Sequence, residues 1–263
     1  MTNWEFPVSG PITLDARLPA GDIQVTATAT EMATVSLRSA SGKRGQQLID
    51  ETEVTFDAGT LTVTVPERIR LLSSTSLDLV VQLPTGSSAK LRAASADVRC
   101  SGELGGLEVK SASGDVRAEL VTGPAKVDTA SGDIELGDVT GDVRVTTASG
   151  DASIEHAGGK VTMNSASGDL RVVRADGSAA ARSASGDVQI TSMASGRADV
   201  STVSGDIKVA VQPGIGVYLD LFAMSGDVRS DLDAAGDGAG AALTLHCRSI
   251  SGDVHVTQAA AAS

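Results

Sequence analysis

An aspartate that recurs at nearly constant spacing is the sharpest candidate for chemistry in this chain. It follows Ser-Gly in all but the first case, and the column is Asp97, Asp115, Asp133, Asp151, Asp169, Asp187, Asp206, Asp227 and Asp253. Stacked carboxylates could bind Ca²⁺ or Mg²⁺ through oxygen. However, calcium-binding β-rolls use a Gly-Gly-x-Gly-x-Asp unit, and here the second glycine is missing. The second residue after the aspartate is often basic and neutralises part of the column, as at Arg99, Arg117, Arg171, Lys208 and Arg229.

We therefore expect each aspartate to hydrogen-bond its own turn, because Asp beside Ser and Gly favours tight corners. The sequence predicts no metal site and no cofactor. The weak candidate metal column is Asp115, Asp133, Asp151, Asp169 and Asp187.

Two hydroxyl columns accompany the aspartates. The first is Ser111, Thr129, Thr147, Ser165, Ser183 and Thr202, and the second is Ser113, Ser131, Ser149, Ser167, Ser185 and Ser204. A flat Thr-x-Thr array could bind ice or sugar, but half of the first column is serine and alanine mostly separates the two columns. Hydrogen bonds along the corners are the preferred interpretation.

Catalytic residues are not evident. His156, His246 and His255 fall in different phases of the repeat, and the sequence contains no Gly-x-Ser-x-Gly, His-Glu-x-x-His or phosphate-loop motif. Cys100 and Cys247 occupy apolar positions, so we expect small buried hydrophobes rather than nucleophiles.

The elements that must position these residues are short strands. From Gly105 to Gly205, twelve glycines recur every nine residues, with a single step of ten, and the second and fourth residues after each glycine are apolar in all 24 positions. Alternation with period two marks a strand with one buried face. Because every second glycine lies in Ser-Gly-Asp, the repeat is eighteen residues, with two strands and two unlike corners. The sequence predicts an all-β solenoid, a single-stranded β-helix that is right-handed by the usual crossover preference.

We expect one elongated solenoid over residues 1–263. Residues 1–85 form irregular strands that cap the stack, residues 86–210 the regular coils, and residues 211–263 longer coils and a tail. The pattern places a hairpin around Asp57-Ala58-Gly59, loops at 41–45 and 231–240, a tail from residue 259, and no helix.

Composition limits the partners. The net charge of −12 and the near absence of aromatic residues argue against nucleic acid. No signal peptide, lipobox or long apolar span is visible, so the expected location is the cytoplasm.

The repeated Ser-Ala-Ser-Gly-Asp-Val unit resembles a bacterial family of unknown function that bears the label "putative adhesin". Trp4-Glu5-Phe6, Gly10-Pro11, Leu14-Asp15 and Leu83-Pro84-Thr85-Gly86 are also similar to its members. The resemblance implies a β-solenoid and supplies no catalytic residues.

We therefore expect a non-enzymatic structural or interaction protein. It binds a protein or cell-envelope component either through the outward faces of its stacked strands or through the ends of the stack. It is expected to be a monomer or small oligomer, because irregular coils at both ends and the negative charge oppose end-to-end growth. The alternatives are a polysaccharide-acting β-helix enzyme and a surface adhesin exported without a recognisable leader.

Overall fold

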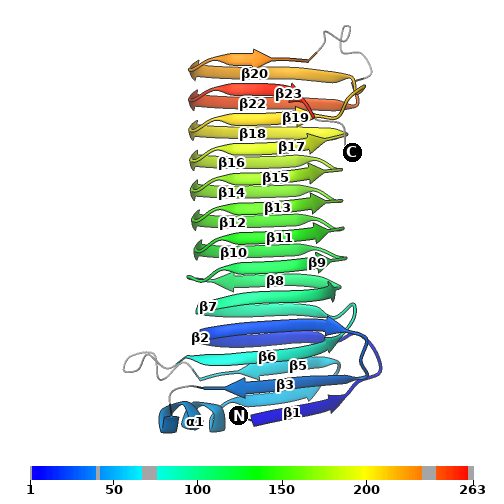
Figure 1. The fold of residues 1–263 in the computed structure, drawn as a ribbon, viewed down its shortest axis with the longest axis vertical. Coiled ribbons are helices and arrows are strands. Elements are labelled where there is room, and N and C mark those ends of the chain that lie inside the picture. The colour runs from blue at the N-terminus through cyan, green and yellow to red at the C-terminus, as the bar shows by residue number, and fades with distance from the viewer. Residues whose placement is uncertain (1, 40–41, 67–75, 233–240, 260–263) are drawn as a thin grey trace. The chain divides into compact units, whose positions relative to one another are not determined.

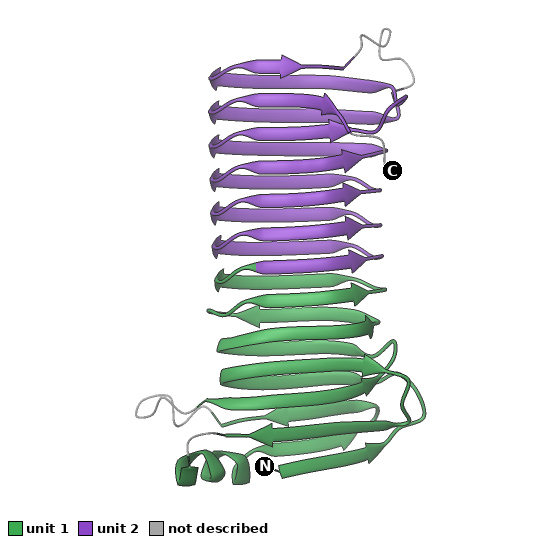
Figure 2. Ribbon diagram, viewed as in Figure 1, with its two compact units in different colours: residues 1–133 green, residues 134–263 purple. Residues whose placement is uncertain are grey.

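The computed structural model describes all residues except 1, 40–41, 67–75, 233–240 and 260–263. The chain forms two compact units, unit 1 (residues 1–133) and unit 2 (residues 134–263), which Figure 2 colours green and purple. Both consist mainly of β-strands arranged in flattened coils (Figure 1), which confirms the predicted all-β solenoid class. The expected tail beyond Ala259 and most of the loop expected at 231–240 lie outside the described residues.

The apolar alternation explains why these segments are strands. All 24 predicted inward side chains are buried, with at most 6% of any residue exposed. Outward residues between them, such as Arg144 between Val143 and Val145, are exposed. A coil with two short strands has room only for a thin core, and its predominantly aliphatic side chains fit that space.

Unit 2 contains thirteen strands among its described residues. They are β11 (Ile134–Val139), β12 (Val143–Ser149), β13 (Ala152–Ala157), β14 (Val161–Ser167), β15 (Leu170–Ala175), β16 (Ala179–Ser185), β17 (Val188–Met193), β18 (Gly196–Ser204), β19 (Ile207–Val211), β20 (Val217–Ser225), β21 (Val228–Ser230), β22 (Leu243–Ser251) and β23 (Val254–Gln258).

These strands form two parallel faces. The β13 face runs in the order β11-β13-β15-β17-β19-β23-β21, and the β14 face runs β12-β14-β16-β18-β22-β20. Residues with equivalent positions pair directly, so Val143 lies beside Val161, which lies beside Ala179. The eighteen-residue period is therefore the spacing between neighbouring positions on one face.

The order of the last coils differs from their order along the chain. Strands β22 and β23 lie between β18/β19 and β20/β21, so the coil that is last in sequence is second to last in space. The long steps in the sequence, from Asp206 to Asp227 and on to Asp253, reflect a chain that skips one level and then returns to fill it.

The standardised corner depends on glycine. Gly168 has φ +134°, and a Cβ atom there would overlap the carbonyl oxygen of Gly150 in the neighbouring coil. A residue without a side chain is needed for both reasons, because the conformation is left-handed and the coils approach closely.

Unit 1 has β1 (Thr2–Pro7), β2 (Thr13–Thr28), β3 (Met32–Arg38), α1 (Gly42–Asp50), β4 (Glu53–Asp57), β5 (Thr60–Thr64), β6 (Leu77–Pro84), β7 (Ser88–Leu104), β8 (Gly106–Ser111), β9 (Val116–Val121) and β10 (Ala125–Ser131). Each of the long strands β2 and β7 contributes to both faces. One face runs β1-β3-β6-β2-β7-β9 and the other β4-β5-β2-β7-β8-β10.

The outermost strands of unit 1 reverse direction. β1 is antiparallel to β3, β3 to β6, and β4 to β5, whereas the remaining pairs of the unit are parallel. The predicted hairpin around Asp57-Ala58-Gly59 is confirmed by the β4–β5 pair.

The expected loop at 41–45 and the expected absence of any helix are wrong, because Gly42–Asp50 forms helix α1. Leu48 and Ile49 are buried, and Gln46 Nε2 donates to Asp50 Oδ1 at 2.8 Å one turn later. Burial of two apolar side chains stabilises a short helix that Gly42 and Gly45 would otherwise disfavour.

Candidate functional site

The aspartate column forms a hydrogen-bonded ladder that links adjacent coils. Asp169 N–H donates to Asp151 Oδ1 at 2.8 Å, and Asp187 N–H donates to Asp169 Oδ1 at 2.8 Å. Asp115 and Asp133 make the same contact in unit 1, at 3.0 Å. Each carboxylate thus accepts from the backbone of the next coil, not from its own corner as the sequence suggested.

At the far end of unit 2 the ladder follows the spatial order of the coils. Asp253 N–H donates to Asp206 Oδ1 and Asp227 N–H donates to Asp253 Oδ1, both at 2.8 Å. Basic neighbours pair with several of these carboxylates, including Arg229 with Asp227 at 2.8 Å. Among the described residues, no group of three or more His, Cys, Asp or Glu side chains gathers where it could hold a metal ion. The absence of a specific metal site stays a prediction.

The hydroxyl columns close the same corners. Thr129 Oγ1 donates to the carbonyl oxygen of Ser131 and Thr147 Oγ1 to that of Ser149, both at 3.0 Å. Thr129 and Thr147 are buried. Thr129 and Thr147 therefore belong to the structure of the corner, whereas Ser131 and Ser149 of the second column are exposed.

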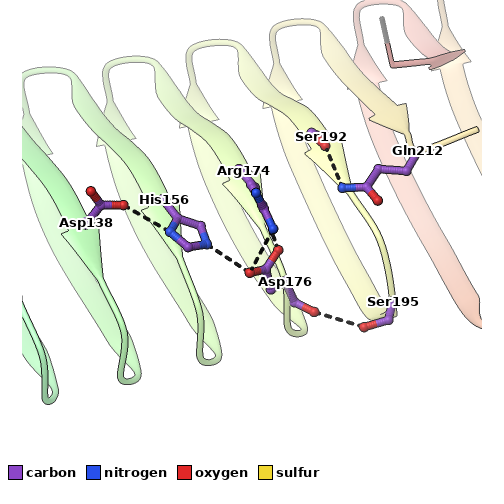
Figure 3. A network of polar contacts seen from close by, with 7 residues as sticks. All are labelled: Asp138, His156, Arg174, Asp176, Ser192, Ser195 and Gln212. Atoms are coloured by element: carbon purple, nitrogen blue, oxygen red, sulfur yellow. Dashed lines mark hydrogen bonds and ion pairs between the residues drawn. The ribbon is translucent and has the colours of Figure 1, made fainter. Parts of the chain in front are cut away.

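A histidine on the β13 face connects three coils, as Figure 3 shows. Nδ1 of His156 lies 3.0 Å from Asp138 Oδ1, and Nε2 lies 2.9 Å from Asp176 Oδ2. Arg174 Nε donates to Asp176 Oδ1 at 2.9 Å. Asp138, His156 and Arg174 occupy equivalent positions on β11, β13 and β15, so the register of the strands brings them together.

The electrostatics of this cluster favour the charged forms. The hydrogen bond that His156 donates to Asp176, together with the one it donates to Asp138, raises the pKa of His156 above its ordinary value. The hydrogen bonds with His156 and Arg174 lower the pKa of Asp176. The imidazolium and the carboxylates thus form charge-assisted hydrogen bonds that connect neighbouring coils.

The other histidines have similar partners. His246 Nδ1 lies 2.9 Å from Asp220 Oδ2, and His255 Nε2 lies 2.8 Å from Asp231 Oδ2. Sequence reasoning missed all three contacts. The signal for His156 was available, because Asp138 and Arg174 are eighteen residues before and after it.

The serines near the His156 cluster do not form a nucleophile with it. Ser195 Oγ donates to the carbonyl oxygen of Asp176 at 2.9 Å, and Gln212 Nε2 donates to Ser192 Oγ at 3.3 Å (Figure 3). A serine nucleophile requires a histidine with a free ring nitrogen within hydrogen-bond reach. Both ring nitrogens of His156 already contact carboxylates.

Both cysteines are buried, as predicted. Cys100 and Cys247 are free thiols with 4% and 0% of their surface exposed. Burial raises the pKa of each to about 12. A thiol of this kind is protonated at neutral pH and is a poor nucleophile.

A group of exposed apolar side chains, which sequence reasoning also missed, lies in the last coils of unit 2. Among the described residues, the exposed large hydrophobic side chains are Val203, Tyr218, Phe222, Met224, Val228 and Ile250. Val203, Ile250 and Met224 occupy neighbouring positions on β18, β22 and β20, where earlier coils have alanine between the two serines. The replacement of alanine by larger side chains at this one position was visible in the sequence.

A surface hollow in unit 1 is lined by parts of β2, β5 and β7, including Arg17, Thr64 and Arg92. Arg92 Nη1 pairs with Asp15 at 3.0 Å, and Arg17 Nε lies 3.8 Å from the same carboxylate. None of the described residues that line the hollow is acidic. Hydrolysis of a glycosidic bond usually needs two carboxyl groups that flank the substrate, and the described part of the lining contains none.

Two faces of stacked strands, parallel over most of their length, define this protein over its described residues as a β-solenoid of the repeat type. The chain belongs to the Toastrack DUF4097 family, a family of unknown function whose model matches residues 12–262. The family resemblance of the Ser-Ala-Ser-Gly-Asp-Val units is thereby confirmed. No curated protein matches the sequence.

Similar solved structures share little sequence with the chain. A "putative adhesin" from Bacteroides fragilis is 14% identical, with 98% of this chain and 96% of that chain covered and a TM-score of 0.48. A "putative lipid binding protein" from Parabacteroides distasonis is 13% identical, with 98% and 96% covered and a TM-score of 0.47. A "putative cell adhesion protein" from Clostridium sporogenes is 10% identical, with 98% and 99% covered and a TM-score of 0.28. None of the described helices is long and apolar enough to cross a membrane.

Proposed function

We propose that the protein is a non-enzymatic interaction protein of the adhesin-like kind, which binds a protein or cell-envelope component through its outward surfaces. The observation that carries this proposal is the engagement of its reactive side chains in contacts between coils. His156 has both ring nitrogens on carboxylates, and the aspartate ladder accepts backbone N–H groups.

The geometry of the faces supports a binding role. Outward residues repeat in register along each face, and ion pairs such as Arg197–Asp199 at 2.8 Å restrain their side chains. A surface restrained in this way loses little conformational entropy when a partner binds. Extended repeat surfaces are used for binding in many solenoid proteins.

The alternative is a polysaccharide-acting enzyme. Such an enzyme would need convergent carboxylates or a similar catalytic group inside a groove. The described lining of the hollow beside Arg17 and Arg92 supplies cations without an acid.

One experiment separates the two functions. The purified chain is incubated with isolated bacterial cell envelopes and with acidic and neutral polysaccharides, and both retention and the release of shortened products are measured. Retention without shortened products is expected. Product release above the level of a buffer control would contradict the non-enzymatic proposal.

Two matched variants locate any activity that is seen. His156→Ala/Asp176→Ala removes the cluster in Figure 3, and Arg17→Ala/Arg92→Ala removes the cations of the hollow. Arg144→Ala, an exposed site on β12, serves as the control.

A further inference from the structure

Strand β20 is an edge strand whose inward side chains are incompletely covered. Among the described strands it pairs with β22 alone. Leu219 and Leu221 on β20 are partly exposed, whereas their neighbours on β22, Leu245 and Cys247, are 0% exposed. The inward side chains of β20 are therefore not covered, among the described residues, by a further coil of the kind that covers those of β22.

The outward side of β20 is also apolar. Tyr218 and Phe222 are 52% and 50% exposed, and Met224 is 70% exposed. Ile250 on β22 extends this surface beside Met224. Apolar side chains gathered on both sides of a sheet edge that has no partner among the described strands are typical of a strand that adds a partner strand.

The charge on this strand does not oppose association. Asp220 is the only charged residue of β20, although the whole chain carries a net charge of −12. His246 lies 2.9 Å from its carboxylate and Arg248 lies 3.5 Å from it. Pairing another strand against β20 would thus bury a carboxylate that already has cationic partners, which lowers the cost of its desolvation.

We propose that β20 binds the β20 strand of a second copy of this chain, antiparallel and about a two-fold axis at Leu221. This register places Asp220 opposite Phe222 of the other copy and Tyr218 opposite Met224. An axis at Asp220 would instead oppose two carboxylates, which destabilises a strand pair. Leu219 would lie opposite Ala223, so that the inward apolar row continues from one copy into the other.

A second copy meets the chemical requirements of the site. The occupant must be a β-strand with apolar residues on both sides and little uncompensated charge, and β20 itself has this composition. The outer strands of unit 1 do not, because β1 and β4 expose Glu5, Glu53 and Asp57 on their outward sides. A two-fold contact uses the same surface on both copies, so it closes at the dimer and does not lead to a filament.

Sedimentation equilibrium of the full chain tests the proposal. Between about 1 and 100 µM we expect the mass to rise from monomer toward dimer, as for interfaces of modest affinity. Leu221→Lys places a charge at the axis, opposite its own copy, and should remain monomeric with an unchanged circular dichroism spectrum. Val203→Lys changes an equally apolar, exposed residue on β18, two strands away, and should dimerise like the wild type. A wild type that stays monomeric, a species larger than a dimer, or a folded Leu221→Lys dimer would overturn the proposal.

Cysteine pairs test the register even if Leu221→Lys fails to fold. Directly opposed residues in antiparallel strands lie about 4.5–5.5 Å apart between Cα atoms, which a disulfide can span. Asp220→Cys/Phe222→Cys should oxidise to a covalent dimer on a non-reducing gel. The matched pair His246→Cys/Arg248→Cys, at equivalent positions on β22, should not. No covalent dimer in the first variant, or equal amounts in both, would refute β20 pairing. This inference is independent of the proposed adhesin-like function, because self-association is measured without any other partner.

Discussion

The outer strands of unit 1 and those of unit 2 differ in how readily their sheet edges can pair with a further strand. In unit 1 the outer strands β1, β3 and β4 run antiparallel to their neighbours, and helix α1 lies among them (Figure 1). The rings of Phe6 on β1 and Phe56 on β4 are 5.7 Å apart between centroids. In unit 2 the outer strands β20 and β21 simply continue the parallel ladder of the coils before them.

The difference shows what a cap requires. A reversal of strand direction breaks the repeated register, and the partly exposed rings of Phe6 and Phe56 contact each other. Outward acidic residues such as Glu5 and Glu53 oppose strand addition. At β20 the register, the inward leucines and the apolar outer surface all remain compatible with another strand. We therefore expect the first arrangement to end the stack of coils and the second to accept the proposed partner strand.

Removal of the cap should have the largest effect. Deletion of residues 1–85 removes β1 to β6 and leaves β7, with Val98 and Cys100 on an uncovered edge. We expect aggregation into large species, because a parallel apolar edge recruits further strands. Sedimentation velocity of the truncated and full chains checks this expectation. A truncated chain that remains a monomer or dimer would show that the first strands are not a cap.

Equivalent leucines in neighbouring coils should differ in their contribution to stability. Leu245 on β22 is 0% exposed, and Leu219, its partner on β20, is partly exposed. Leu245→Ala should cost about 2–5 kcal/mol in the free energy of unfolding, as for other buried leucines. Leu219→Ala should cost less than half as much at concentrations where the chain is monomeric, because part of the side chain is already in water. Urea unfolding of both variants measures the ratio, and equal losses would contradict an incompletely covered β20.

The His156 cluster should make a smaller, pH-dependent contribution. Because the pKa of His156 is raised in the folded state, the stabilisation that its charged form provides is complete below about pH 6.5. It is lost as pH rises through the folded-state pKa. Because the pKa of Asp176 is lowered in the folded state, the stabilisation that its carboxylate provides is complete above about pH 4. It is lost as pH falls through the lowered pKa.

His156→Gln should therefore lower the melting temperature most between about pH 4 and 6.5, by roughly 1–3 °C for a partly exposed pair. Ser153→Ala, on the same strand, is the control. A deficit that grows above pH 8 would mean that the cluster does not depend on a charged imidazole.

Calcium should have the smallest effect. Carboxylates of the aspartate ladder such as Asp151 and Asp169 use an oxygen for the next backbone N–H group, so they supply single ligands and not cages. Addition of about 5 mM CaCl₂ should change the melting temperature by less than about 1 °C, since only specific binding to the folded state would raise it. A saturable rise that Asp169→Asn/Asp187→Asn abolishes would restore the metal-binding interpretation.

Much of the fold could be predicted from the period alone. The alternation around each glycine identified inward residues such as Val143 and Ile190, because a thin core excludes charged side chains from those positions. The spatial order of the last coils could not be predicted. Every coil carries the same pattern, so Val200 could pair equally well with Leu221 or with Cys247, and only the folded chain shows that it pairs with Cys247.

The candidate sites also divide into those that the sequence spacing could predict and those that it could not. The His156 cluster follows from residues eighteen positions apart, so register arithmetic could have found it. The pair of His246 with Asp220 depends on the inserted coil and was hidden for that reason. Helix α1 was missed because its stability comes from burial of Leu48 and Ile49 and not from the helix propensity of its two glycines.

Amide hydrogen exchange at several protein concentrations tests the contrast between the two terminal regions most directly. Exchange within Val217–Ser225 should slow as the concentration rises from about 1 to 100 µM, because a second copy protects the free edge of β20. Exchange within Thr2–Pro7 and Glu53–Asp57 should stay constant, because exposed acidic residues on those strands oppose pairing with a second copy. Constant exchange in β20, or an equal change in β1 and β4, would contradict the account.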